Sequence, residues 1–302
     1  MSNSNYFKGS SLVYYDLHSI SERDVKPWLT DYLTSEYCSL VDTKGRFALD
    51  KNHLCEGFFI PIVISGKKPK RNYCYSNKEL ARKIANRIEI EHFRSSEEAA
   101  WEIESILNKK DFTDTIIGSY SHDNCPIVDF DYPDNDTKPY ITLYYNNFEC
   151  ETDEEFKAAL SNCLSHEYFH FVHNRWIGSD FFKPRRGLAA KQRNSVTESL
   201  ADFFSFVYSL SRCRDSFDKT DSHLKYAEYR LELWKERVGS NWPYACAYCY
   251  FFNHIGWPVS YSSDYREYLN NGCVEKFNMV MDVSKDNFAK AYKLLDVPNT
   301  FI

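Results

Sequence analysis

The order of apolar and polar residues predicts a mixture of short strands and helices in the first third of the chain. Runs rich in Val, Ile and Tyr indicate strands, and apolar residues that recur every three or four positions indicate helices. We expect strands at residues 11–17 and 57–65, and helices at residues 25–40 and 77–89. Nothing in this part points to a chemistry, so residues 1–94 are interpreted as an N-terminal α/β region of unassigned role.

A clearer pattern begins near residue 95. A helix is indicated at residues 96–107, and loops rich in Asp, Asn, Ser and Pro then separate three strand candidates. We expect these strands at residues 112–119, 126–131 and 140–146. Thr152 and Glu155 then match the S/T-x-x-E capping box, which predicts a helix that starts there and runs to about Arg175.

The rest of the chain is predicted to be mainly helical. A loop at residues 176–194 contains glycine and proline, and an apolar pattern resumes after it. We expect helices starting near Ser195, at residues 227–238, from Trp242 to about Gly256, and in a capped final segment at residues 283–292. The helix at residues 227–238 is predicted to be exposed and amphipathic. The whole pattern predicts an α+β fold, with residues 95–302 forming one domain.

The helix after Thr152 carries an H-E-x-x-H motif, His166-Glu167-Tyr168-Phe169-His170. Residues four apart lie on one face of a helix, so both imidazoles can reach the same metal ion. Glu167 projects beside them, where its carboxylate can take a proton from a metal-bound water. A chance match on a surface helix is the alternative interpretation.

A third ligand is needed, because catalytic zinc usually takes three protein ligands and keeps one position for water. The best candidate is Glu198, which follows His170 by 28 residues. Asp202 lies four residues later on the same helical face, where it can accept the second N–H of a ligand histidine. The alternative is that both are solvated acids. His173 lies another turn along the helix, about 5 Å from the pair, and we expect it to be a packing residue or a support of a ligand.

H-E-x-x-H followed by E-x-x-x-D resembles the gluzincin superfamily of zinc metallopeptidases, over about residues 96–260. The resemblance implies a zincin-like catalytic domain, with a small, mostly antiparallel sheet over the HExxH helix and a helical C-terminal subdomain. It also implies one Zn²⁺ ion, held by His166, His170 and Glu198. By the same resemblance Glu167 is the general base and Asp202 supports a ligand, and the strand at residues 140–146 holds the substrate as an added β-strand.

A second similarity concerns the segment that begins at Pro243. Aminopeptidase-type gluzincins place a tyrosine at the start of a later helix, often after proline, and Pro243-Tyr244 is similar. This implies that Tyr244 donates a hydrogen bond to the oxyanion of the tetrahedral intermediate. Its competitors, which we expect to be core or pocket lining, are Tyr248, Tyr250 and His254. The G-x-M-x-N motif that recognises a free N-terminus is absent, which favours an endopeptidase or a specialised processing enzyme over an aminopeptidase.

Composition narrows the class of protein further. The chain has 302 residues, 26% of them charged and 43% hydrophobic, as in an ordinary soluble protein with a sizeable core. Its net charge of −6 argues against nucleic acid as a partner. With no signal sequence at the N-terminus and no run as long as a membrane span, the expected location is the cytoplasm and no membrane partner is expected. Delivery into another cell by a signal-less route is the alternative.

The ten cysteines are expected to be free thiols, since no export signal accompanies them. The Cys246–Cys249 pair is included, because it falls in a predicted apolar helix. Together these features predict a zinc-dependent metallopeptidase that acts on a peptide or protein substrate. Two alternatives remain: an inactive gluzincin-like module that binds peptides, and a metal site that residues 1–94 cover or direct to one substrate. The sequence does not give the oligomeric state.

Overall fold

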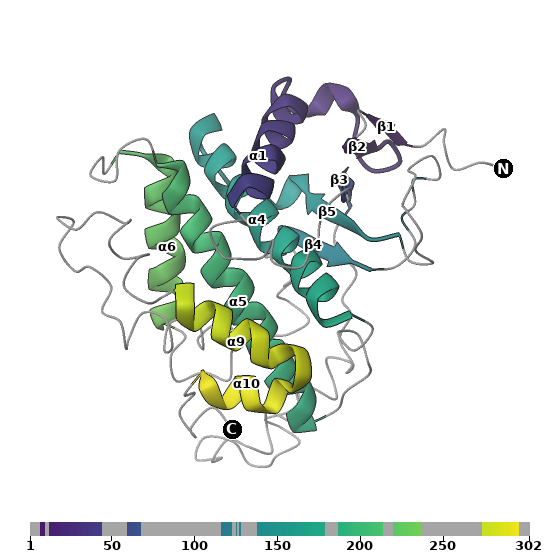
Figure 1. Ribbon diagram of the computed structural model, residues 1–302. Helices are drawn as coiled ribbons and strands as arrows, with labels where there is room; N and C mark the ends of the chain where they lie inside the picture. Colours follow the sequence, from purple (N-terminus) through teal and green to yellow (C-terminus); the bar gives the residue numbers. More distant parts are fainter. Residues whose placement is uncertain are drawn as a thin grey trace, which may run out of the picture.

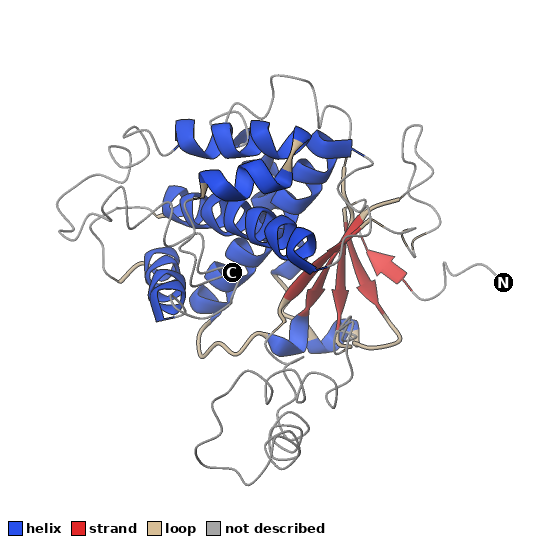
Figure 2. Cartoon of the chain, turned by 90° about the horizontal axis from the view of Figure 1, so that it is seen from below, coloured by secondary structure: helices blue, strands red, loops and turns tan. Residues whose placement is uncertain are grey.

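In the computed structural model, a small sheet packs against a set of helices, an α+β arrangement that is mostly helical (Figure 1). The structure describes residues 7–9, 12–43, 59–67, 116–122, 125, 127, 138–178, 187–213, 220–236 and 274–295. Most of the described helices lie on one side of the sheet (Figure 2). The α+β class expected from the sequence is therefore confirmed.

Five strands form one mixed sheet in the order β1-β2-β3-β5-β4. Their bounds are Phe7–Gly9 (β1), Val13–Asp16 (β2), Ile62–Ser65 (β3), Gly118–Ser121 (β4) and Tyr140–Tyr144 (β5). β3 pairs in parallel with both β2 and β5, whereas the two outer pairs are antiparallel. The prediction of a mostly antiparallel sheet was therefore wrong. The parallel pairs arise because long connections link these strands, and the connection from β2 to β3 contains the helix Leu29–Thr43.

The strands expected at residues 11–17, 57–65 and 140–146 are present as β2, β3 and β5, with shorter bounds. Among the described residues of the strand expected at 112–119, Gly118 and Ser119 do lie in a strand, because they form the start of β4. The helices expected at residues 77–89 and 96–107, and nearly all of the strand expected at residues 126–131, lie outside the described residues.

The N-terminal strands form part of the same sheet as the strands next to the H-E-x-x-H helix. The Ile62 N–H donates to the Leu12 carbonyl, and the Ile141 N–H donates to the Pro61 carbonyl. Pro61 stands just before β3, where a proline leaves the ladder of that strand intact. The boundary expected between residues 94 and 95 lies outside the described residues, and the described strands on its two sides share one sheet.

Helix α1 (Leu29–Thr43) follows β2 and packs against α4, the helix that carries the H-E-x-x-H motif. α4 spans Asp153–Ile177, and its N-terminus has the predicted capping box. Thr152 Oγ1 accepts the Glu155 N–H at 3.2 Å, and Glu155 Oε2 accepts the Thr152 N–H at 3.2 Å. α4 ends at Gly178, whose φ of +74° suits glycine. Local sequence therefore fixes both ends of this helix.

Helix α5 spans Gly187–Arg212 and begins earlier than the predicted start near Ser195. The prediction started the helix near Ser195, but this serine is buried inside the helix, with 2% of its surface exposed. Residues 188–193 are Leu, Ala, Ala, Lys, Gln and Arg, all good helix formers, so the helix extends through them.

The C-terminal helices also differ from the prediction. α6 (Ser222–Glu236) begins after Asp221, which caps it by accepting the His223 and Leu224 N–H groups. It was expected to be exposed, yet among its described side chains those of Leu224, Ala227 and Leu231 are buried. α9 (Val274–Asp286) was not predicted, whereas the capped final helix is confirmed as α10 (Phe288–Leu294), with Asn287 as its cap.

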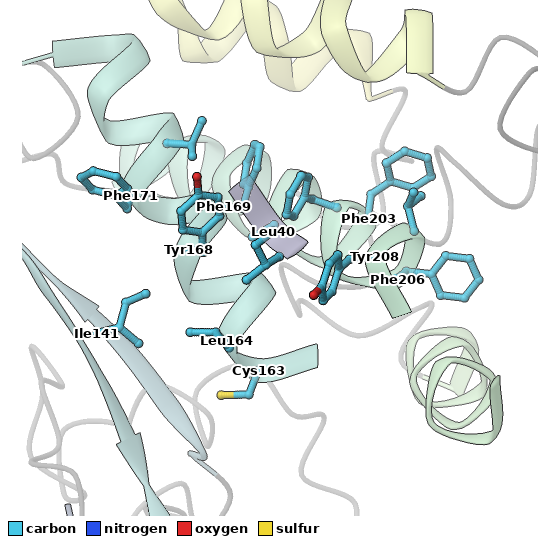
Figure 3. Close-up of a cluster of buried hydrophobic side chains, with 14 of the residues drawn as sticks. Leu40, Ile141, Cys163, Leu164, Tyr168, Phe169, Phe171, Phe203, Phe206 and Tyr208 are labelled. Carbon is cyan, nitrogen blue, oxygen red and sulfur yellow. The ribbon is translucent and has the colours of Figure 1, made fainter. Parts of the chain in front are cut away.

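The main hydrophobic core lies where α4 meets the sheet on one side and α5 on the other (Figures 1 and 3). Large side chains that are almost fully buried fill it, among them Tyr37, Tyr168, Phe169, Phe171, Phe203, Phe204, Phe206, Tyr208 and Phe277. Each contributes about 1.5–3 kcal/mol by burial. This packing fixes α4 against α5 and so sets the frame of the site. No helix among the described residues is long and apolar enough to span a membrane.

Candidate metal centre

His166 and His170 lie one turn apart on α4, with their side chains close together. Their Nε2 atoms are 3.0 Å apart, and the two rings meet edge to face with centroids separated by 4.7 Å. Only 12% of each side chain is exposed. The i, i+4 spacing of the motif thus brings two nitrogen ligand atoms together, as predicted.

Glu198 reaches the same point from α5. Its Oε2 atom lies 3.2 Å from His166 Nε2 and 3.5 Å from His170 Nε2. Ligand atoms bound at about 2.0–2.1 Å to one tetrahedral zinc ion lie about 3.3 Å from one another. The three observed separations fit this geometry, so one ion can contact all three atoms. The group of His166, His170 and Glu198 could therefore hold a metal ion.

The charges around this group favour a cation. Burial raises the pKa of Glu198, but the nearby His170 and His166 imidazoles outweigh burial and hold that pKa well below its usual range. Burial lowers the pKa of His166, but hydrogen bonds to Asp202 and Glu198 outweigh burial and raise it to about 10. These acids therefore attract a positive charge to His166, and either a proton or a metal ion can supply it.

Asp202 lies behind His166, one turn after Glu198 on α5. Its carboxylate is fully buried, and its Oδ1 atom is 3.0 Å from His166 Nδ1. When Nδ1–H donates to this carboxylate, the Nε2 lone pair of His166 faces the metal position. Asp202 therefore stands where the sequence placed it.

Glu167 projects from α4 towards strand β4. Burial raises the pKa of its carboxyl group, and the Tyr120 backbone N–H hydrogen-bonds to that group. Gly118 of β4 packs so closely that an added Cβ atom there would lie 3.2 Å from Glu167 Cγ and would clash with Cys163 Sγ. The glycine thus lets the strand approach the glutamate. The Tyr120 side chain also contacts α4, since its hydroxyl accepts the Asn174 Nδ2–H at 2.6 Å.

Comparisons of the chain with protein-family models, with curated proteins and with solved structures find no match. The interpretation of the centre therefore rests on its own geometry.

The edge of the sheet nearest to Glu167 belongs to β4. β5 is paired on both sides, by β3 and by β4, so it offers no edge to a further strand. The expectation that the strand at residues 140–146 holds a substrate was therefore wrong. Among the described residues, β4 pairs with β5 on one side, and the backbone N–H of its Tyr120 hydrogen-bonds to the Glu167 carboxylate.

His173 does not belong to the group of metal ligands. It is fully buried, with its Nε2 atom 2.9 Å from the Ser284 hydroxyl of α9 and its ring 5.5 Å from that of Phe169. Burial, together with the charge of His170, lowers the pKa of His173 to about 3, so its imidazole is neutral at physiological pH. It packs between α4 and α9.

Tyr244 and its competitors Tyr248, Tyr250 and His254 lie outside the described residues, as do Cys246 and Cys249. The oxyanion donor therefore stays a prediction. The described cysteines, Cys38, Cys125, Cys150, Cys163 and Cys213, are free thiols.

Sequence reasoning missed Arg230 of α6. Its Nη2 atom lies 2.9 Å from Asp202 Oδ1, the same oxygen that faces His166. The sequence feature that could have revealed this contact is the apolar stripe of Leu224, Ala227 and Leu231, which predicts a buried face on α6. Arg230 stands at the border of this stripe, and an arginine there can reach past the buried face to an acid.

Proposed function

We propose that this protein is a zinc-dependent metallopeptidase with a gluzincin-like centre. The observation that carries the proposal is that Glu167 interacts electrostatically with all three residues whose ligand atoms converge, while Asp202 lies directly behind one of the ligand histidines. A structural metal site needs no extra carboxylate beside it. A hydrolytic site does, because a proton must be removed from the attacking water.

Zinc suits the donor set. Two imidazole nitrogens and one carboxylate oxygen leave a fourth tetrahedral position open, which is the arrangement of catalytic rather than structural zinc sites. The Glu198 side chain is 24% exposed, so the group is not sealed from solvent. When bound, zinc would supply a Lewis acid that polarises a carbonyl oxygen and lowers the pKa of water to about 7.

The chain's own groups then have distinct roles. Glu167 accepts the proton of the attacking water and passes it to the leaving amine. Its burial, which raises the pKa of its carboxyl group, makes it a stronger base. The Tyr120 N–H holds the carboxylate at the edge of the sheet. Asp202 keeps the His166 ring oriented, so that neither ligand nor base has to rearrange during the reaction.

We further propose that the substrate is a peptide in extended conformation that binds beside β4, next to Glu167. Added strands bind through main-chain hydrogen bonds, and β4 is the strand whose backbone lies against Glu167. This mode places a peptide bond in the interior of a chain beside the base. It fits an endopeptidase or a processing enzyme better than an aminopeptidase, in line with the missing motif for a free N-terminus.

The proposal is tested with purified full-length protein and the Glu167→Gln variant. Metal analysis should find one zinc ion per chain in both proteins, and cleavage of a broad peptide library should fall by about 10²- to 10⁴-fold in the variant. The matched control is Glu154→Gln, an exposed glutamate near the start of the same helix, which should cleave like the wild type.

Purified protein without zinc, or an E167Q variant that cleaves at the wild-type rate, would contradict the proposal. Zinc and peptide binding without cleavage by the wild type would instead support the inactive binding module.

A further inference from the structure

The buried Asp202 carboxylate has two partners on two different helices. Its Oδ1 atom is 3.0 Å from His166 Nδ1 of α4 and 2.9 Å from Arg230 Nη2 of α6. The carboxylate has no exposed surface, and 21% of the Arg230 side chain is exposed. α4, α5 and α6 lie side by side, so all three helices meet at this one oxygen (Figure 1).

A buried carboxylate is unfavourable unless an opposite charge compensates it. The N–H of a metal-bound, neutral imidazole supplies only a dipole, whereas Arg230 supplies a full positive charge. The local charges also balance. The carboxylates of Glu167, Glu198 and Asp202 carry three negative charges, and a divalent ion with Arg230 carries three positive ones. Without Arg230 the buried group would keep one uncompensated negative charge.

We propose that Arg230 is a positioning residue of the metal centre. It holds the Asp202 carboxylate in place as the acceptor for His166 Nδ1–H, and thereby keeps His166 Nε2 aimed at the metal position. α6 thus contributes a residue to the metal centre, as α4 and α5 do, although Arg230 does not bind the metal. This inference rests on the proposed metal site, and it predicts that metal affinity depends on a residue that does not touch the metal.

The position of the contact separates this role from that of a simple ion pair between helices. Arg230 meets the oxygen that faces the ligand histidine, so its loss should change how that histidine presents its lone pair. Groups that orient ligand histidines in this way typically change metal affinity by about 10–100-fold when they are removed. An ion pair that serves only to join α5 and α6 would change the stability of the folded chain instead.

The test measures Zn²⁺ affinity of the full chain by competition with a chelator. Arg230→Met keeps the length of the side chain but removes its charge, and it should weaken Zn²⁺ binding by about 10–100-fold. Arg230→Lys keeps a positive charge but lacks the planar guanidinium group. Its Zn²⁺ affinity should lie between those of Arg230→Met and the wild type. The matched control is Lys225→Met, an exposed residue on the same helix, which should bind Zn²⁺ like the wild type.

A double-mutant comparison shows whether Arg230 acts through Asp202. If it does, Asp202→Asn combined with Arg230→Met should lose no more Zn²⁺ affinity than Asp202→Asn alone. The visible spectrum of the Co²⁺-loaded Arg230→Met variant should also shift, since the geometry at His166 changes. The Arg230→Lys variant provides the affinity comparison if Arg230→Met does not fold.

Unchanged Zn²⁺ affinity in the folded Arg230 variants, with only their unfolding temperature lowered, would overturn the proposal. A wild-type chain that binds no Zn²⁺ would instead refute the metal site itself, so the two failures are distinct.

Discussion

Gly118 of strand β4 packs directly against Glu167 of α4, closely enough that no larger residue fits there without displacement. A Cβ atom at this position would lie 3.2 Å from Glu167 Cγ and 3.4 Å from Glu167 Oε1. The distance between the edge of the sheet and the proposed base is therefore set by the absence of a side chain.

Gly118→Ala should push β4 away from α4 or move Glu167. Overpacking of this kind costs about 1–3 kcal/mol of the free energy of unfolding. A displacement of about 1 Å near the base can also cost on the order of 100-fold in the rate of cleavage. Chemical unfolding and peptide cleavage measure the two effects. Ser35→Ala, at an exposed position of α1, is the control that should change neither, and a G118A variant with full activity would argue against the role given to this contact.

His173 predicts a loss of stability in acid. Burial lowers its pKa to about 3, compared with 6.5 for the unperturbed group, so between these two values the unfolded chain binds a proton that the folded chain does not. The contribution of His173 to stability is therefore complete above pH 6.5 and is lost as the pH falls towards 3. The slope reaches about 1.4 kcal/mol per pH unit.

Urea unfolding at pH 7 and pH 5 should show a smaller acid loss for His173→Gln than for the wild type, because the glutamine does not titrate. Two proteins with the same dependence on pH would contradict this prediction. His18→Gln is the control, since His18 lies at the surface.

Removal of the metal should destabilise the chain, because the proposed ion joins α4 to α5. A ligand that binds only the folded state adds about 2.7 kcal/mol when its free concentration is 100 times its dissociation constant. Addition of a chelator should therefore lower the unfolding temperature, and Zn²⁺ in excess should restore it. His170→Ala should show no such response. An unfolding temperature that is independent of chelator in the wild type would count against a bound ion.

A second buried carboxylate, that of Glu36, is predicted to contribute to stability, since its partners among the described residues are Arg212, Ser161 and Tyr208 and not the candidate metal ligands. Glu36 of α1 is fully buried, with its carboxylate 2.7 Å from Arg212 Nη2 and 2.8 Å from both the Ser161 and Tyr208 hydroxyls. Arg212→Met should leave this carboxylate without its counter-charge and cost about 3–5 kcal/mol.

The double variant Glu36→Leu with Arg212→Met should recover part of that loss, because both charges are then removed together. Thermal unfolding of the three proteins is the measurement. A double variant that is less stable than Arg212→Met alone would contradict the account. The Zn²⁺ affinity of the folded variants should not change.

The two pairs of candidate site residues could be predicted from the sequence because the spacing within each pair is local, whereas the meeting of the two pairs depends on how α5 packs on α4. His166 and His170 are four residues apart on one helix, as are Glu198 and Asp202, and helical spacing alone places each pair on one face. The capping box at Thr152 is local in the same sense. These features do not depend on how the rest of the chain packs.

The contacts that were missed depend on tertiary packing. Gly118 meets Glu167 because β4 is at the edge of the sheet, and the strand order depends on which distant strands pair. Arg230 reaches Asp202 because α6 packs on α4 and α5, although its own sequence looks like that of an exposed helix. The start of α5 was predicted too late, near Ser195, because the apolar pattern resumes there, yet the helix already begins at Gly187.

The division of the ligands between α4 and α5 has a consequence for the growing chain. During synthesis His166 and His170 emerge first, and Glu198 follows only after the intervening residues and the first turns of α5. Until α5 has docked, the two histidines lack both their third ligand and the carboxylate that orients His166. A nascent or truncated chain without α5 therefore lacks a complete centre, so any peptidase activity would begin only once the helical half of the protein has folded.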